Sequence, residues 1–116
     1  MQMVPLQKRQ WRSVQMVKKV LERDLERHFS NVCKKLGILT LKLNVTYSRG
    51  WPDRVVVLSD GQVFWVELKT LTGIVSPLQE RVHKLLRQCG HTVYVLRTKE
   101  EITNVLGSTQ IPTKSS

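Results

Sequence analysis

Residues 51–69 read WPDRVVVLSDGQVFWVELK, and this stretch decides the fold. Two apolar runs, 54–58 and 62–69, flank the dipeptide Asp60-Gly61. Asp-Gly between two such runs is typical of the tight turn of a β-hairpin. The sequence therefore predicts two antiparallel strands joined by this turn.

A helix and a strand are expected before this hairpin. Residues 13–36 carry apolar side chains at helical spacing, between Ser13 as N-cap and Gly37 as a stop. Residues 39–47 alternate between apolar and polar side chains, as a half-buried strand does. The helical stripe expected to face the core contains Val14, Val17, Leu21, Leu25, Phe29, Val32 and Leu36.

The segment after the hairpin predicts a helix, a strand and a shorter helix. Ser76-Pro77 is typical of a helix start, and Gly90 ends this helix. Residues 91–96 form a fourth strand, which should run parallel to a neighbour because a helix precedes it. Thr98 then caps a helix through residue 106. The order αβββαβ with an appended helix predicts an α/β fold, a small mixed β-sheet flanked by helices.

Length and charge limit the classes of function. The 116 residues hold one domain, placed at 13–106, between a basic N-terminal arm, 1–12, and a flexible polar tail, 107–116. No apolar run is long enough to cross a membrane, so no membrane partner is expected. Scattered cysteines and an N-terminus unlike a secretory signal favour the cytoplasm. Nineteen Lys and Arg against nine Asp and Glu give +10, which indicates a nucleic-acid partner.

Two carboxylates and a lysine are expected to converge at the end of the hairpin. Alternation puts Trp65, Glu67 and Lys69 on one face of the returning strand, and the short turn brings Asp53 close to them. Such a group can hold a hard divalent cation beside a charged amine. The alternative is an ordinary cross-strand salt bridge between Lys69 and either carboxylate. Pro52-Asp53, the hairpin and the basic composition together favour the cation site.

The extended pattern resembles a known nuclease family. Pro52-Asp53, thirteen intervening residues and Glu67-Leu68-Lys69 are similar to the PD-(D/E)xK motif. The surrounding sequence, from about residue 22 to residue 95, resembles the virus-type replication-repair nuclease family, VRR-NUC. The similar segments are 50–54, 66–70, Gly73, Ser76-Pro77-x-Gln79-x-x-x-His83-x-x-Leu86, and Lys34-Lys35-Leu36-Gly37 followed by Leu41-Lys42. The resemblance implies a restriction-endonuclease-like αβββαβ core.

The resemblance also implies a role for each residue of the site. Asp53 and Glu67 would ligate Mg²⁺ or Mn²⁺, together with the backbone carbonyl of Leu68. Lys69 would orient or activate the attacking water and stabilise charge on the phosphate. Gln79 would support the nucleophile or a water on the metal.

A third carboxylate is expected from the first helix. Counting back from Gly37, Glu26 falls where related nucleases carry their helix acid. On the helical wheel, however, Glu22 lies closer to the apolar stripe and so closer to the sheet. Glu26 is ranked first and Glu22 second.

The implied function is a metal-dependent DNA endonuclease that acts on branched DNA such as four-way (Holliday) junctions. Stand-alone chains that resemble this one are associated with phage or bacterial genomes, with DNA repair and recombination, and with homodimers. No small-molecule cofactor is expected beyond the cation. Two alternatives are a flap or nicking nuclease with the same chemistry, and an inactive DNA-binding module.

Further DNA contacts are expected from the arm and from the loop before the site. The candidates are Lys8, Arg9, Arg12, Arg49 and Trp51. Position 51 often holds a smaller apolar residue in the family, and Trp there does not disturb the chemistry. His83, beside the apolar face of the second helix, is expected to be a packed structural residue.

Overall fold

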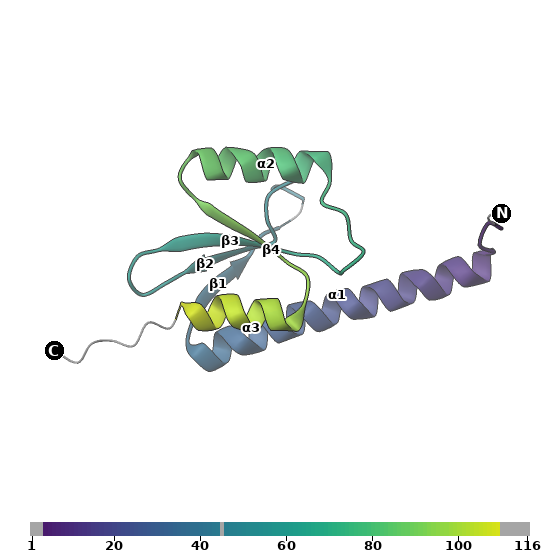
Figure 1. Cartoon of the computed structure of the whole chain (residues 1–116), viewed down its shortest axis with the longest axis horizontal. Helices are drawn as coiled ribbons and strands as arrows, with labels where there is room; N and C mark the ends of the chain where they lie inside the picture. The colour runs from purple at the N-terminus through teal and green to yellow at the C-terminus, as the bar shows by residue number, and fades with distance from the viewer. Residues whose placement is uncertain (1–3, 45, 110–116) are drawn as a thin grey trace.

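The computed structural model describes residues 4–44 and 46–109 (Figure 1). Its elements follow the predicted order, αβββαβ and then the appended helix. They are α1 (Lys8–Leu36), β1 (Leu39–Lys42), β2 (Arg54–Val57), β3 (Val63–Leu68), α2 (Pro77–Gln88), β4 (Thr92–Leu96) and α3 (Lys99–Ser108). The expected arm, first strand and tail include residues 1–3, 45 and 110–116, which lie outside the described residues.

Four strands form one mixed sheet in the order β1-β2-β3-β4. β1 and β3 both run antiparallel to β2, whereas β4 is parallel to β3, as predicted. The predicted turn joins β2 and β3. Asp60 Oδ1 accepts a hydrogen bond from the backbone N–H of Gln62 at 3.0 Å, and Gly61 has the positive φ of 90° that the turn requires.

The first strand is shorter than predicted. Pairing with β2 ends at Lys42 and Arg54. The chain then turns at Asn44, whose carbonyl accepts hydrogen bonds from the N–H groups of Tyr47 and Ser48 at 3.3 and 3.1 Å. Because these bonds close a turn, the alternation at residues 43, 44, 46 and 47 does not extend the strand.

α1 begins at Lys8, so the prediction that residues 8–12 belong to an arm and that Ser13 caps the helix is wrong. The backbone N–H of Gln7 donates to Gln10 Oε1 at 2.8 Å, which caps the helix without a Ser or Thr. The Ser13 hydroxyl instead donates to the carbonyl of Arg9 at 3.2 Å within the helix. The predicted stop is confirmed, since Gly37 has a φ of 68°.

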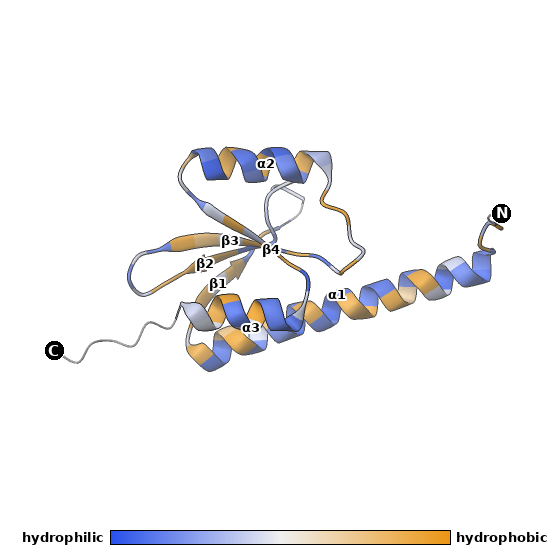
Figure 2. Ribbon diagram, in the orientation of Figure 1, coloured by the Kyte–Doolittle hydropathy of each residue, from blue (hydrophilic) through white to orange (hydrophobic). Residues whose placement is uncertain are grey.

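The apolar stripe of α1 faces the core only along its second half. Leu25 and Phe29 are buried, but Val14, Val17 and Leu21 are 46%, 58% and 50% exposed, so the prediction for these three is wrong. A helix of 29 residues is about 44 Å long, whereas the six residues of β3 span about 20 Å. The first turns of α1 therefore extend past the sheet (Figure 1), and apolar segments continue along them (Figure 2). No helix in the described part of the chain is long and apolar enough to span a membrane.

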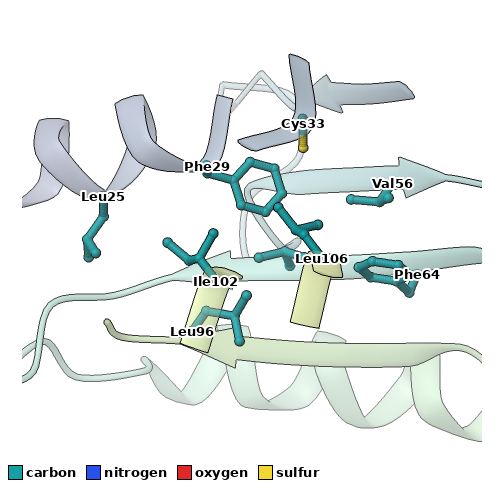
Figure 3. Packing of buried hydrophobic residues seen from close by; sticks show 9 residues of the cluster. Leu25, Phe29, Cys33, Val56, Phe64, Leu96, Ile102 and Leu106 are labelled. Carbon is teal, nitrogen blue, oxygen red and sulfur yellow. The ribbon is translucent and has the colours of Figure 1, made fainter. Parts of the chain in front are cut away.

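Helices cover both faces of the sheet, with α1 and α3 on one side and α2 on the other (Figure 1). The main core lies under α1 and α3 (Figure 3). It consists of Leu25, Phe29, Cys33, Val56, Phe64, Val66, Leu96, Ile102 and Leu106. Under α2, a smaller cluster of Val82, Leu86 and Val93 packs with Trp65. Because β2 and β3 are antiparallel, the start of β2 and the end of β3 lie at the same end of the sheet.

Candidate active site

Asp53 and Glu67 meet where β2 begins and β3 ends. Arg54 pairs with Val66, so Asp53 and Glu67 stand at the next position of the two strands. Asp53 Oδ2 accepts a hydrogen bond from the backbone N–H of Leu68 at 2.9 Å. This bond ties the two strand ends together and fixes the Asp53 carboxylate beside Glu67.

Glu67 is a buried carboxyl group, with only 1% of its surface exposed. Burial, hydrogen bonding to Asp53 and the negative charge of Asp53 raise the pKa of Glu67 to about 9, against the opposing charge of Lys69. This raised pKa favours the protonated form of Glu67 at neutral pH while no cation is bound. The carboxyl groups of Asp53 and Glu67 therefore share a proton at the place where two carboxylates of an active site would hold a metal ion.

His83 of α2 contacts Glu67. Its Nε2 lies 3.5 Å from Glu67 Oε1, and neither atom has a hydrogen-bond partner among the described residues. Burial lowers the pKa of His83, and the charges of Arg87 and Lys69 lower it further. Both shifts favour the neutral forms, a neutral imidazole facing a protonated carboxyl group, over an ion pair. His83 is packed as predicted, but it also touches a residue of the site.

An open pocket of about 220 Å³ adjoins this carboxyl pair, between α1, the end of β3 and the start of α2. Its wall includes every residue predicted for catalysis or metal binding. These are Glu22, Glu26, Asp53, Glu67, Leu68, Lys69 and Gln79. Lys18 also lines the pocket and was not predicted.

Lys69 is held at the backbone rather than by an ion pair. Its N–H donates to the carbonyl of Leu96 at 3.0 Å, which extends the pairing of β3 and β4 by one residue. In the part of the chain that the structure describes, Lys69 forms no salt bridge with Asp53 or Glu67. The alternative of a cross-strand salt bridge is therefore not supported, and the ammonium group remains available for a substrate.

Gln79 belongs to the cap of α2 as well as to the pocket. Its Oε1 accepts a hydrogen bond from the N–H of Ser76 at 2.9 Å, while Ser76 Oγ accepts one from the N–H of Gln79 at 3.1 Å. The reciprocal bonds fix the side chain. Because Oε1 is used in the cap, Gln79 can offer its side-chain amide nitrogen as a donor in the pocket.

Glu26 and Glu22 both line the pocket, but among the described residues only Glu26 forms an ion pair with the sheet. Lys42 Nζ donates to its two carboxylate oxygens at 2.9 and 3.1 Å. Within residues 4–44 and 46–109, no three carboxylate, imidazole or thiol groups lie close enough to form a metal centre. The helix acid and the pair of Asp53 and Glu67 are thus in one pocket without being in contact.

Comparison with known proteins identifies the family. No family model matches the chain. "Putative nuclease p44" of Acyrthosiphon pisum secondary endosymbiont phage 1 is 33% identical over 81 residues, which cover 70% of this chain and 87% of that protein. A solved structure described as a VRR_NUC domain matches with a TM-score of 0.67 and 26% identity, over 75% of this chain and 95% of that one. The chain belongs to the VRR-NUC family. The resemblance is confirmed, and so is the α/β fold predicted from the order of the elements.

In this VRR-NUC fold, the candidate DNA-binding residues lie in two places. Lys8, Arg9 and Arg12 are exposed on the first turns of α1, which extend away from the sheet. Arg49 and Trp51 are exposed in the loop before Asp53. Their contact with DNA stays a prediction.

One arginine that supports the wall of the VRR-NUC pocket has no signal in the sequence. Arg97, after β4, donates through Nη1 to the carbonyls of Thr70 and Gly73 at 2.7 and 2.6 Å. Both acceptors line the pocket. Arg97 therefore holds the loop that follows the Glu67-Leu68-Lys69 strand, from a position that sequence spacing could not connect with it.

Replacing the two helix acids tests their ranking in the VRR-NUC site. Glu26→Gln is expected to lower the cleavage rate about 100-fold, and Glu22→Gln less than about 5-fold, because one helix acid would suffice to complete the coordination of the cation that the family resemblance implies. Cleavage rates across a Mg²⁺ titration measure both effects. Asp24→Asn is the matched control, since Asp24 lies on the same helix and pairs with Lys99 at 2.9 Å. A disabled Glu22 variant beside an active Glu26 variant would reverse the ranking.

Proposed function

We propose that this protein hydrolyses phosphodiester bonds of DNA with a divalent cation at Asp53 and Glu67. The observation that supports this most is that the buried Glu67, the half-buried Asp53 and Lys69 line one pocket. The relative p44 is named as a nuclease, and the matched solved structure is a VRR_NUC domain. The charge of +10 favours a phosphate backbone as the ligand.

The donor atoms fit Mg²⁺ or Mn²⁺. Carboxylate oxygens of Asp53 and Glu67 and the carbonyl of Leu68 are hard ligands, and Mg²⁺ commonly uses only one or two carboxylates together with substrate phosphates. Glu67 Oε1 is buried without a hydrogen-bond partner among the described residues. Its raised pKa indicates that the ionised pair needs a positive partner. When bound, the cation supplies a polarised water and neutralises charge on the phosphate.

The chain's own residues position the reactants. Lys69 donates to the phosphate oxygens as negative charge develops on them, or to the attacking water. Gln79 offers its amide nitrogen to the same water. Glu26, or Glu22 as the second candidate, supplies a further oxygen from α1. The N–H of Leu68 keeps the Asp53 carboxylate in its orientation.

The proposed substrate is branched DNA, such as a four-way junction, cut by a homodimer. Two copies would place two sites on two strands, as paired incision requires. Apolar side chains that a second copy could cover are exposed on α1 and on the edge strand β1, where Leu39 and Leu41 are 68% and 62% exposed. A role in DNA repair or recombination, in the cytoplasm of a bacterial or phage-infected cell, would follow from such a substrate.

A panel of DNA substrates tests this proposal. Linear duplex, nicked duplex, flap and four-way junction are incubated with the full chain in Mg²⁺, in Mn²⁺ and in EDTA. We expect cleavage in either cation and none in EDTA, with the junction cut faster than the duplex at matched salt. Light scattering at micromolar concentration should give the mass of a dimer.

Each alternative predicts a different pattern. Binding without cleavage in either cation would identify an inactive DNA-binding module. Preference for flaps or nicks would keep the chemistry and change the substrate. A monomer that cuts linear duplex as fast as junctions would contradict the homodimer and the branched substrate together.

A further inference from the structure

Trp51 presents an indole ring at the surface, two residues before Asp53. The side chain is 42% exposed. Its backbone N–H donates to the carbonyl of Ser48 at 3.0 Å, which closes the loop. Gly50 has a φ of 80°, and a Cβ there would lie 2.7 Å from Leu78 Cγ, so the loop packs directly against α2. Trp51 is therefore held in a fixed place beside the active site.

A second aromatic ring backs Trp51. The ring centroids of Trp51 and Trp65 are 5.4 Å apart, with an angle of 57° between the planes. Trp65 is itself held, because its Nε1 donates to His91 Nδ1 at 3.1 Å and its ring packs with the cluster under α2. A ring supported in this way loses little freedom on binding, and its exposed side suits another flat ring.

We propose that Trp51 is a stacking site for an unpaired DNA base, an inference that rests on the proposed function. Bases inside a duplex stack on one another, whereas a flap, a gap or an opened branch leaves a base face uncovered. The charge around the loop favours nucleic acid over an apolar protein partner. Arg49 is exposed within it, and residues 44–52 include no acidic side chain. Trp51 thereby directs the site toward DNA with unpaired nucleotides.

Binding measured in EDTA separates this inference from catalysis. The full chain is titrated against single-stranded oligothymidine and against blunt duplex of equal length, by fluorescence anisotropy at matched salt. Trp51→Leu keeps an apolar contact with Trp65 but removes the ring, whereas Trp51→Phe keeps a ring. Trp11→Leu is the control, since Trp11 is 51% exposed on α1.

We expect Trp51→Leu to weaken single-strand binding about 10-fold and to change duplex binding less than about 2-fold. Trp51→Phe should retain most of the affinity, and Trp11→Leu should leave the ratio of the two affinities unchanged. The dependence of affinity on salt should be unchanged in Trp51→Leu but reduced in Arg49→Gln, because stacking releases no counterions. The unaltered chain should quench 2-aminopurine at an unpaired position and not at a paired one, a readout that needs no variant.

Equal losses on both DNA forms, or no loss, would overturn the inference. So would a fall in the mass by light scattering with an unchanged affinity ratio, since Trp51 would then serve self-association. Selective single-strand binding by a chain that cuts nothing in Mg²⁺ would contradict the proposed function alone. Active cleavage without any selectivity from Trp51 would contradict this inference alone.

Discussion

Asp53→Asn, Glu67→Gln and Lys69→Ala are each expected to reduce DNA cleavage at least about 1,000-fold, equivalent to about 4 kcal/mol of transition-state stabilisation. The first two variants remove the negative charge that would hold the cation, and the third removes the amine that faces the phosphate. Single-turnover cleavage of a junction substrate in Mg²⁺ measures the loss. Affinity for DNA in EDTA should change little, because the basic surface is retained.

Matched variants distinguish loss of chemistry from loss of fold. Asp60→Asn changes a carboxylate of the hairpin turn, and Lys34→Ala changes a lysine in the last turn of α1, both outside the pocket. Both should cut DNA at the rate of the unaltered chain. Near-normal cleavage by any one of the Asp53, Glu67 or Lys69 variants, once purified and folded, would show that the active site is elsewhere.

Local signals were sufficient to predict most of the sheet and which residues line the pocket together. The turn at Asp60 sets the register of β2 and β3, and strand alternation then directs Glu67 and Lys69 to the pocket that Asp53 also lines. The N-cap of α2 at Ser76 was also predicted correctly, from the dipeptide Ser76-Pro77. Each of these features depends on residues that are close in sequence, or on a hairpin whose geometry is fixed by its turn.

Features that depend on how long another element is, or on where it lies, could not be predicted. Helical periodicity identifies an apolar face, but it does not show where the sheet ends, so the exposure of Val14 and Val17 was missed. The contact of His83 with Glu67 and the pair of Glu26 with Lys42 join elements whose relative placement no local pattern encodes. Gln7 was missed as a cap because Gln caps helices less often than Ser or Thr.

Glu67→Gln is also expected to stabilise the cation-free protein while it abolishes cleavage. An ordinary glutamate in the unfolded chain has a pKa near 4.5, whereas the pKa of the folded group is about 9. The folded state therefore binds a proton that the unfolded state releases across this range. The free energy of unfolding should fall as pH rises from 4.5 toward 9, by at most about 1.4 kcal/mol per pH unit.

The glutamine side chain in this variant is neutral at every pH, so the variant's stability should lack that dependence. Thermal unfolding in EDTA at pH 8 should show a melting temperature about 5 °C or more higher for the variant, and the melting temperatures of the two proteins should converge near pH 5.

Mg²⁺ should raise the melting temperature of the unaltered chain at pH 8, because it replaces the proton, and should leave that of the variant unchanged. Glu80→Gln, at an exposed position of α2, should keep the pH dependence of the unaltered chain. A flat stability between pH 5 and 8 in EDTA would mean that Glu67 is ionised in the folded protein, and that a positive group already satisfies the pair without a cation.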